Sequence, residues 1–204
     1  MHHPSLLAAR VSVLLVFFVH GAVFSSWISR IPEVQSGLHL TTGEFGFALL
    51  GVAVGSLISL PAAGWFIARF GSMPVTVTAS VWFCLALIGP GWAASGTQLW
   101  AALCVLGLSA GAMDVAMNAQ GVVVERLARK PMMSGFHAMF SIGGMAGSAV
   151  GGFIAKAGVP VRTHLFCAAL IFLAIILAVS RGLLPSSADA APGRRAFHVS
   201  PVIL

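Results

Sequence analysis

Long stretches without any charged residue recur through most of this chain and limit what it can fold into. No Asp, Glu, Lys or Arg occurs in residues 11–29, 45–68, 70–113, 131–155 or 163–180. A helix needs about 20 apolar residues to cross the hydrocarbon of a bilayer, whereas a membrane-spanning strand needs about ten residues of alternating polarity. Stretches of this length therefore predict an all-α integral membrane protein, with the lipid bilayer as its solvent.

The composition of the 204-residue chain agrees with a membrane location. Hydrophobic residues make up 58% of the chain and charged residues 8%, whereas a soluble domain carries roughly a quarter charged residues. The formal net charge is +6, but the cations are dispersed between the apolar stretches, which argues against a nucleic-acid partner. The three cysteines have neither a metal-binding nor a redox spacing, so we expect no metal and no cofactor.

Six membrane-spanning helices are predicted. The uncharged stretch 70–113 is too long for one helix, and Gly89-Pro90-Gly91 divides it, because Pro lacks a backbone donor and Gly weakens a helix. The expected spans are about 11–28, 45–68, 73–93, 98–119, 136–155 and 163–183. An N-terminal segment, residues 1–10, precedes this bundle (11–184), and a polar tail, residues 185–204, follows it. We expect the tail to be mobile.

The positive charges favour an orientation with both chain ends in the cytoplasm. In that orientation the cytoplasmic segments hold eight Lys or Arg residues and the opposite loops hold three, as the positive-inside rule requires. The eight are Arg10, Arg69, Arg126, Arg129, Lys130, Arg181, Arg194 and Arg195, and the three are Arg30, Lys156 and Arg162. Trp27, Trp92 and Trp100 are then expected in an aromatic belt at the opposite membrane surface.

Asp114 is the most informative residue for function, because an ionised carboxylate near the middle of a membrane span is costly and a functional role is the default expectation. Gly107, Gly111, Asp114 and Asn118 lie on one side of the fourth predicted helix, and Glu125 continues this stripe. Such a stripe faces another helix or water. Two interpretations stay open: Asp114 exchanges a proton or contacts a polar substrate, or it forms a structural hydrogen bond, for example with Asn118.

His20 is a second candidate, because it lies midway between Arg10 and Arg30 and hence near the middle of the first span. Either it is a satisfied interior residue, or it lines the same cavity as Asp114. The second interpretation follows if spans one to three and four to six are two repeats, because His20 and Asp114 would then occupy comparable depths.

The fifth predicted span carries two stripes. The polar stripe consists of His137, Ser141, Gly144 and Ser148, and the row of small residues consists of Gly143, Gly147 and Gly151. A row of small residues lets helix backbones pack closely, so we expect a helix contact there. His137 near the cytoplasmic end is expected to pair with Glu125, either in a gate or in a fold contact.

An enzyme is not expected. Ser134 or Ser141 with His164 are the candidates for an intramembrane serine hydrolase, but the predicted topology places Ser134 and His164 at opposite membrane faces. Two groups so far apart cannot share a proton. The chain also has no P-loop pattern, so an ATP-driven reaction within it is not expected.

The link between the second and third spans carries a family resemblance. Residues 64–71 (GWFIARFG) resemble the loop motif of the major facilitator superfamily: Gly, three residues, Asp, Arg or Lys, any residue, Gly. Gly64, Arg69 and Gly71 match, whereas Ala68 stands where the family has Asp. With six spans and both ends inside, the resemblance implies the N-terminal six-helix half of a transporter fold that usually has twelve helices.

The fourth and fifth spans narrow the resemblance. Residues 111–118 (GAMDVAMN) and residues 137–144 (HAMFSIGG) are similar to the branch of the family near fucose permease, particularly to its uncharacterised bacterial inner-membrane members. The first span lacks the acidic residue that serves the cavity in fucose permease. Residues 147–152 (GSAVGG) are similar to the antiporter motif Gly-Pro-x-x-Gly-Gly, with Ser148 in place of Pro.

These observations predict a secondary transporter, or half of one, in a bacterial inner membrane, moving a small polar solute coupled to protons. The expected substrate and proton site is Asp114, Asn118 and His20, and the expected gate or structural network is Glu125, His137 and Arg69. One six-helix bundle cannot alternate access alone, so we expect a second copy, a separately encoded half or further residues as its partner. The alternatives are a non-transporting scaffold or assembly protein, in which Asp114 is structural, and an inactive transporter fragment.

Overall fold

The structure, a computed structural model, describes residues 4–189, and all regular structure in this range is helical. Six segments in it are long and apolar enough to cross a membrane, so the prediction of an all-α, six-span protein is confirmed. The helices are α1 (Leu6–Ile28), α2 (Ile31–Gly37), α3 (Thr42–Phe70), α4 (Ser72–Ala86), α5 (Gly89–Trp92), α6 (Gly96–Ala128), α7 (Met133–Lys156), α8 (Val161–Ser180) and the short 3-10 helix η1 (Ser186–Ala188).

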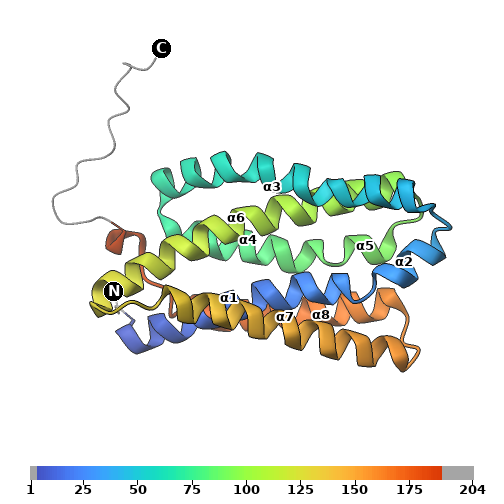
Figure 1. The fold of residues 1–204 in the computed structure, drawn as a ribbon. Coiled ribbons are helices and arrows are strands. Elements are labelled where there is room, and N and C mark those ends of the chain that lie inside the picture. The colour runs from blue at the N-terminus through green and yellow to red at the C-terminus, as the bar shows by residue number, and fades with distance from the viewer. Residues whose placement is uncertain (1–3, 190–204) are drawn as a thin grey trace, which may run out of the picture.

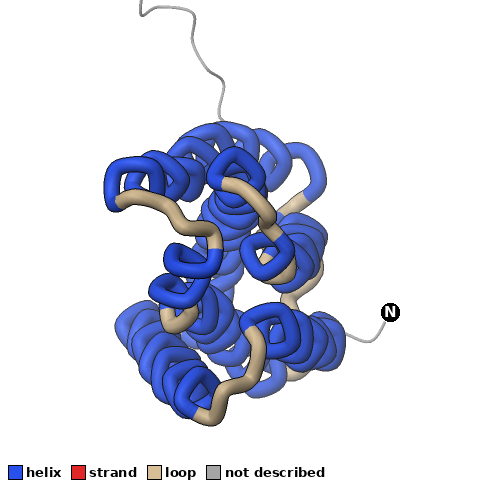
Figure 2. Tube along the Cα trace, turned by 90° about the vertical axis from the view of Figure 1, so that its right-hand side faces the viewer, coloured by secondary structure: helices blue, strands red, loops and turns tan. Residues whose placement is uncertain are grey.

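The long helices are aligned along one common axis, with successive spans antiparallel, and they form two layers. One layer contains α3, α4, α5 and α6, and the other contains α1, α7 and α8 (Figure 1). The most extensive contacts join α3 to α6 and α1 to α7, and the layers meet where α4 packs on α8 and α1 packs on α6. Figure 2 shows the same helices end-on, with their connecting loops toward the viewer.

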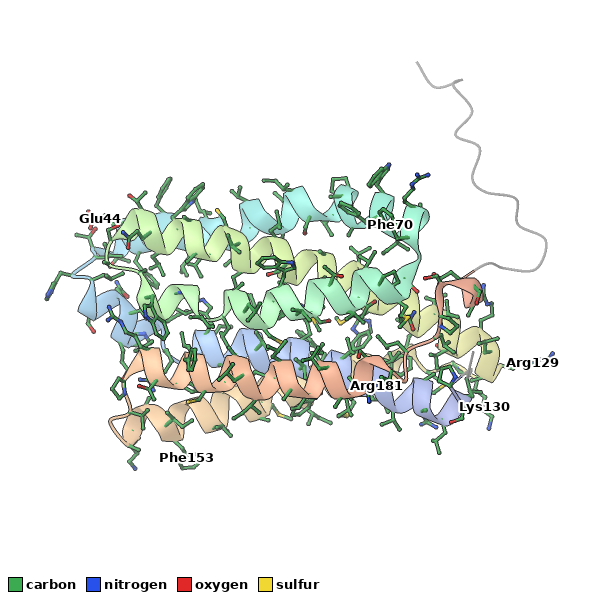
Figure 3. The ribbon with its side chains drawn as sticks, turned by 180° about the vertical axis from the view of Figure 1, so that it is seen from behind. Glu44, Phe70, Arg129, Lys130, Phe153 and Arg181 are labelled. Atoms are coloured by element: carbon green, nitrogen blue, oxygen red, sulfur yellow. The ribbon has the colours of Figure 1, made fainter. Side chains whose placement is uncertain are left out.

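The two ends of the bundle differ in charge. We call the end that holds the start of α1, the α3–α4 turn, the α6–α7 turn and η1 the termini end, and the opposite end the far end (Figure 1). Figure 3 shows Arg129, Lys130 and Arg181 at the termini end and Glu44 at the far end. Within residues 4–189, the predicted cytoplasmic segments therefore share one end of the bundle. The orientation of that end in a membrane stays a prediction.

Several helix boundaries differ from the predicted spans. α6 continues to Ala128 instead of ending near residue 119, and Arg129 ends it in the left-handed conformation (φ 52°). Gly89-Pro90-Gly91 does not separate the third and fourth spans. α4 ends at Ala86, and these three residues begin α5, where Pro90 occupies the first turn and its missing N–H costs nothing. The connection to α6 lies at residues 93–95.

Large apolar side chains lie both inside and outside the bundle, as expected for a protein dissolved in lipid. Phe17 and Phe83 are fully buried, whereas Trp65 and Phe153 are 61% and 74% exposed. Phe153 projects from the outer surface in Figure 3. The prediction that Trp27 belongs to an aromatic belt is wrong, because its side chain is 1% exposed and packs in the core.

Glycines allow the two main helix pairs to approach closely. A Cβ atom at Gly107 would lie 2.1 Å from the backbone oxygen of Val52 on α3. One at Gly143 would lie 2.0 Å from the backbone oxygen of Phe18 on α1. Three further glycines of α6 and α7 have tight surroundings. A Cβ atom at Gly147 would lie 2.5 Å from the backbone oxygen of Ala22, and Cβ atoms at Gly111 and Gly151 would lie 2.2 and 2.0 Å from the hydroxyl oxygens of Ser59 and Ser29. Any side chain at these positions would push the helix pairs α3–α6 and α1–α7 apart.

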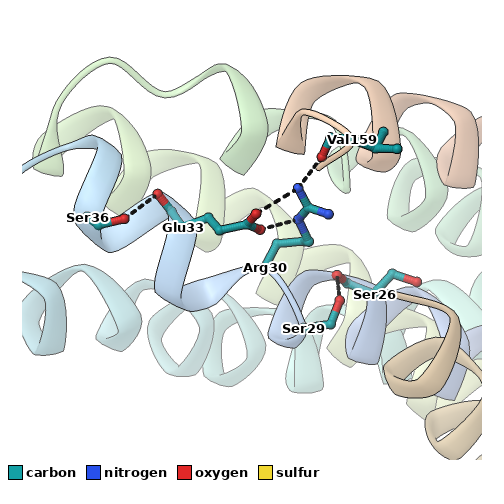
Figure 4. Close-up of polar contacts among 6 residues, drawn as sticks. All are labelled: Ser26, Ser29, Arg30, Glu33, Ser36 and Val159. Atoms are coloured by element: carbon teal, nitrogen blue, oxygen red, sulfur yellow. Dashed lines mark hydrogen bonds and ion pairs between the residues drawn. The ribbon is translucent and has the colours of Figure 1, made fainter. Parts of the chain in front are cut away.

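Arg30 joins separate segments at the far end, although the sequence suggests only a loop cation. Its side chain is fully buried, and its Nε lies 2.5 Å from Oε2 of Glu33. Its Nη2 donates to Oε1 of Glu33 (3.2 Å) and to the backbone oxygen of Val159 in the α7–α8 turn (2.6 Å), as Figure 4 shows. A buried guanidinium requires such partners. Arg30 thus ties the corner between α1 and α2 to the α7–α8 turn.

We expect Arg30→Met to lower the free energy of unfolding by about 1–3 kcal/mol, because the Val159 carbonyl loses its buried donor. Thermal unfolding of the purified chain in detergent, followed by circular dichroism, measures this loss. Lys156→Met is the matched control, because Lys156 is exposed at the same end of the bundle and should change stability by less than about 0.5 kcal/mol. Equal melting temperatures for the two variants would contradict the structural role of Arg30.

The start of the polar tail also differs from the prediction. Leu183 and Leu184 are 3% and 6% exposed, and residues 186–188 form η1 against the bundle. We call residues 183–189 the docked segment. The expectation of a mobile tail is wrong for residues 185–189, which make hydrogen bonds to α3, α4 and α6. The rest of the predicted tail lies outside the described residues.

Candidate functional site

Asp114 and Asn118 lie one turn apart on α6 and are hydrogen-bonded. Nδ2 of Asn118 donates to Oδ1 of Asp114 (3.3 Å) and to the backbone oxygen of Asp114 (2.8 Å). Both side chains are half-buried. The hydrogen bond holds the two polar groups together on one side of the helix. It leaves the carboxylate with free acceptor capacity, because a carboxylate has about four lone-pair positions.

His137 lies on the neighbouring helix α7, and among the described residues no hydrogen bond or ion pair joins it to Asp114. Its imidazole is exposed and packs edge-on against the ring of Phe17, with 5.3 Å between the ring centroids. Ser141, one turn further along α7, is also exposed, and its hydroxyl donates to the backbone oxygen of His137 (3.2 Å). We call Asp114, Asn118, His137 and Ser141 the polar face.

The polar face cannot be in contact with lipid tails. Ionisable and hydroxyl groups at membrane depth face a water-filled cavity or another protein surface, because lipid offers them no hydrogen-bond partner. Exposed apolar side chains on α3, such as Leu57 and Trp65, have the character expected for lipid contact. The face combines a carboxylate, an amide, an imidazole and a hydroxyl. These groups can hold a polar solute and can exchange a proton.

His20 lies in the core of the bundle, where it is 8% exposed. Its ring packs against Phe83 on α4 and Phe140 on α7, with centroid separations of 5.1 and 5.5 Å. Two aromatic rings therefore pack against it in this conformation, and it does not share the exposure of the polar face. Its predicted place in the same cavity as Asp114 stays a prediction.

Glu125 and Arg69 lie at the termini end. Glu125 Oε2 accepts hydrogen bonds from the backbone amides of Met132 (2.5 Å) and Met133 (2.8 Å), which begin α7. A carboxylate at the start of a helix satisfies amides that have no partner within the helix. Glu125 thus connects α6 to the start of α7 through these two amides, and it does not bind His137. Arg69 is exposed in the last turn of α3.

Residues 107–111 (GLSAG) have the letters of the Gly-x-Ser-x-Gly pattern found in serine hydrolases. That pattern works as a nucleophile elbow only at a sharp turn between a strand and a helix. Here it lies inside α6, where the Ser109 hydroxyl donates to the backbone oxygens of Val105 (2.8 Å) and Leu106 (3.0 Å). Ser109 is an ordinary buried helix serine.

Sequence reasoning missed Gln120, which is fully buried on α6. Its side chain bridges Ser72 at the start of α4 and Leu184 after α8, with three hydrogen bonds between 2.7 and 3.1 Å. Its position between Asn118 and Gly121 was the available signal, because a polar side chain near the end of a span needs an internal partner. Among residues 4–189, no group of three or more His, Cys, Asp or Glu side chains is placed to hold a metal ion.

Six apolar helices in two layers, with a half-buried carboxylate on a polar face, define a multi-pass membrane protein bundle. Comparison with known families agrees. The sequence matches the profile of the Major Facilitator Superfamily over residues 13–203. The chain belongs to this family of membrane transporters.

Three curated relatives show how much of a family member the chain spans. An uncharacterized MFS-type transporter of Yersinia pestis is 30% identical over 183 residues, 90% of this chain and 48% of that protein. An uncharacterized transporter of Sinorhizobium fredii is 35% identical over 155 residues, 76% of this chain and 41% of that protein. Membrane protein MosC of Rhizobium meliloti is 30% identical over 187 residues, 92% of this chain and 44% of that protein. The chain spans about half the length of these relatives.

Two solved structures have the same fold. The nucleoside transporter NupG superposes with a TM-score of 0.72 at 12% sequence identity, over 90% of this chain and 46% of that chain. The human organic anion transporter MFSD10 superposes with a TM-score of 0.57 at 14% sequence identity, over 88% of this chain and 48% of that chain. At this level of identity the similarity concerns the fold alone.

Proposed function

We propose that this chain forms a six-helix bundle of a secondary transporter that couples the movement of a small polar solute to protons. The observation that carries the proposal is the polar face, where the half-buried Asp114 carboxylate is hydrogen-bonded to Asn118. Membership of the family supports a role in membrane transport in general. A carboxylate at this depth adds a group that can bind and release a proton during a transport cycle.

Each residue of the polar face has a chemical role in this proposal. Asp114 is the proton site and a contact for the solute, and Asn118 holds the carboxylate and offers further hydrogen bonds. His137 on α7 supplies an exposed imidazole that can form a hydrogen bond with a solute. The same contact also supports a competing interpretation, in which the hydrogen bond between Asp114 and Asn118 is purely structural. In that case the chain is a non-transporting scaffold.

The polar face also indicates what covers it. Secondary transporters place the substrate site between two bundles that rock against each other. A second six-helix bundle, either in the same longer polypeptide or in another molecule, would cover the face and enclose a water-filled site. The lengths of the relatives support this arrangement, because each is about twice as long as the matched segment. The cations at the termini end support a cytoplasmic position for that end.

Flux measurements on the purified 204-residue chain test the proposal, in vesicles that hold enough copies for two bundles to pair. The vesicles contain a pH-sensitive dye and receive nucleosides, neutral sugars or organic anions in separate pools. We expect one pool to dissipate an imposed pH gradient faster than in protein-free vesicles, and the same pool to raise the melting temperature of the chain. If every pool leaves both the pH gradient and the melting temperature unchanged, the chain is a scaffold or an inactive fragment, and the proposal is wrong.

A further inference from the structure

The docked segment contacts parts of the bundle that lie far away in the sequence. It follows α8, yet its hydrogen bonds reach the end of α3, the start of α4 and the last turns of α6. Ser186 Oγ donates to the backbone oxygen of Phe70 (2.9 Å), and Nη2 of Arg126 donates to the backbone oxygen of Ala188. Figure 1 shows η1 at the termini end, beside the ends of these helices.

Asp189 supplies the N-terminal cap of α4. Its Oδ2 accepts from the backbone amide of Ser72 and its Oδ1 from the hydroxyl of Ser72, each at 2.6 Å. The residue before α4 is Gly71, which has no side chain to cap the helix. The first amides of a helix need an acceptor, and an anionic acceptor also interacts favourably with the helix dipole. The cap of α4 therefore comes from a residue 117 positions away.

Gly71 is required for this contact. Its φ angle is +88°, a conformation that other residues rarely adopt. A Cβ atom at Gly71 would lie 2.2 Å from the Cβ of Ser186 and 2.9 Å from Oδ2 of Asp189. The α3–α4 turn therefore has both the backbone shape and the open space that the docked segment needs.

Gln120 completes the connection from inside the bundle. Its Nε2 donates to the Ser72 hydroxyl (2.7 Å) and to the backbone oxygen of Leu184 (2.9 Å), and its Oε1 accepts from the Leu184 amide (3.1 Å). Ser72 and Gln120 are almost completely buried. The buried side chain of Gln120 thus contacts both the start of α4, at Ser72, and the docked segment, at Leu184. Asp189 joins the same two elements from the outside.

We propose that Asp189 is a positioning residue that makes the α3–α4 turn, the end of α6 and the docked segment open and close as one unit. The acidic position of the family's loop motif is Ala68 here, and the carboxylate that meets this turn comes instead from Asp189. For transport, the proposal rests on the proposed function. Separation of this unit would free the ends of α3 and α4 at the termini end and change how easily the bundle changes conformation.

Hydrogen–deuterium exchange of the full-length chain in detergent tests the structural step. We expect Asp189→Ala to raise the exchange rate of the Ser72 amide about tenfold or more, because the amide loses a charged acceptor. The exchange rate of the Leu184 amide should increase together with that of the Ser72 amide, although Asp189 does not contact Leu184. Asp189→Asn keeps one acceptor oxygen and should give a smaller increase at both amides.

Glu44→Ala is the matched control, because Glu44 caps α3 at the far end through Thr41. It should raise exchange near Thr41 and leave Ser72 and Leu184 unchanged. If Asp189→Ala raises exchange at Ser72 alone, or at neither amide, the three elements do not open as one unit and the proposal is wrong.

The transport step is measured separately, in the vesicle assay described above. At equal amounts of folded protein, Asp189→Ala should change the rate of solute-dependent proton flux several-fold, and Glu44→Ala should leave it unchanged. An unchanged rate would limit Asp189 to a fold contact and overturn its role in transport. If the wild-type chain carries no flux, the proposed function fails, whereas the exchange experiment still decides whether the unit exists.

Discussion

Asp114→Asn is expected to reduce solute-dependent proton flux through the reconstituted chain by at least about 100-fold, the usual size of the loss when a proton-transferring group is removed. Asn has nearly the same shape as Asp and can still form the hydrogen bond with Asn118. It cannot bind and release a proton at neutral pH. The loss should therefore appear in the flux and not in the helical content, which circular dichroism measures.

Two further variants make the Asp114 experiment specific. Asp114→Glu keeps the carboxyl group and should retain part of the flux. Glu44→Gln changes an exposed carboxylate at the start of α3 and should retain all of it. The infrared carbonyl band of a protonated carboxyl offers an independent signal, since a pH-dependent band that disappears in Asp114→Asn shows that Asp114 titrates. Equal flux in the wild type and Asp114→Asn would show that Asp114 is structural.

Gly143→Val is expected to lower the free energy of unfolding by about 3 kcal/mol, at the upper end of the usual cost of overpacking. A Cβ atom at Gly143 would lie 2.0 Å from the Phe18 backbone oxygen on α1, which cannot move away without shifting the helix. The change therefore separates α1 from α7. Thermal unfolding in detergent and the elution profile of the purified protein measure the effect.

Gly152→Val on the same helix is the control for Gly143→Val. A Cβ atom at Gly152 has nothing within 4 Å among the described residues. Both variants exchange the same two residue types in α7, so the difference between them isolates the contact with α1. We expect Gly152→Val to change stability by less than about 0.5 kcal/mol. Equal destabilisation by both would mean that helix propensity, and not close packing, decides the outcome.

The spans and part of the candidate site could be predicted from the sequence. Uncharged stretches long enough to cross a bilayer leave little choice but helices, because every backbone polar group must be satisfied within the segment. The relation between Asp114 and Asn118 was equally accessible, since residues four positions apart lie on one side of a helix. Both are local properties of the chain.

The remainder of the site depends on contacts between helices. His137 belongs to α7, which packs mainly on α1, and no spacing in the sequence contains the arrangement of α7 relative to α6. His20 has the depth that the sequence predicts, but Phe83 and Phe140 enclose it. Glu125 was expected to pair with His137, and the amides of Met132 and Met133 take its carboxylate instead.

The sequence by itself determined that this protein crosses a membrane on six helices and carries a carboxylate at membrane depth, because hydrocarbon imposes the same demand on every segment that enters it. Only the tertiary structure decided which polar groups are partners. Arg30 is buried against Val159, and Asp189 caps a helix that begins more than 100 positions earlier. Such contacts join residues that only packing brings together, and a buried charge is stable only where packing provides its partner.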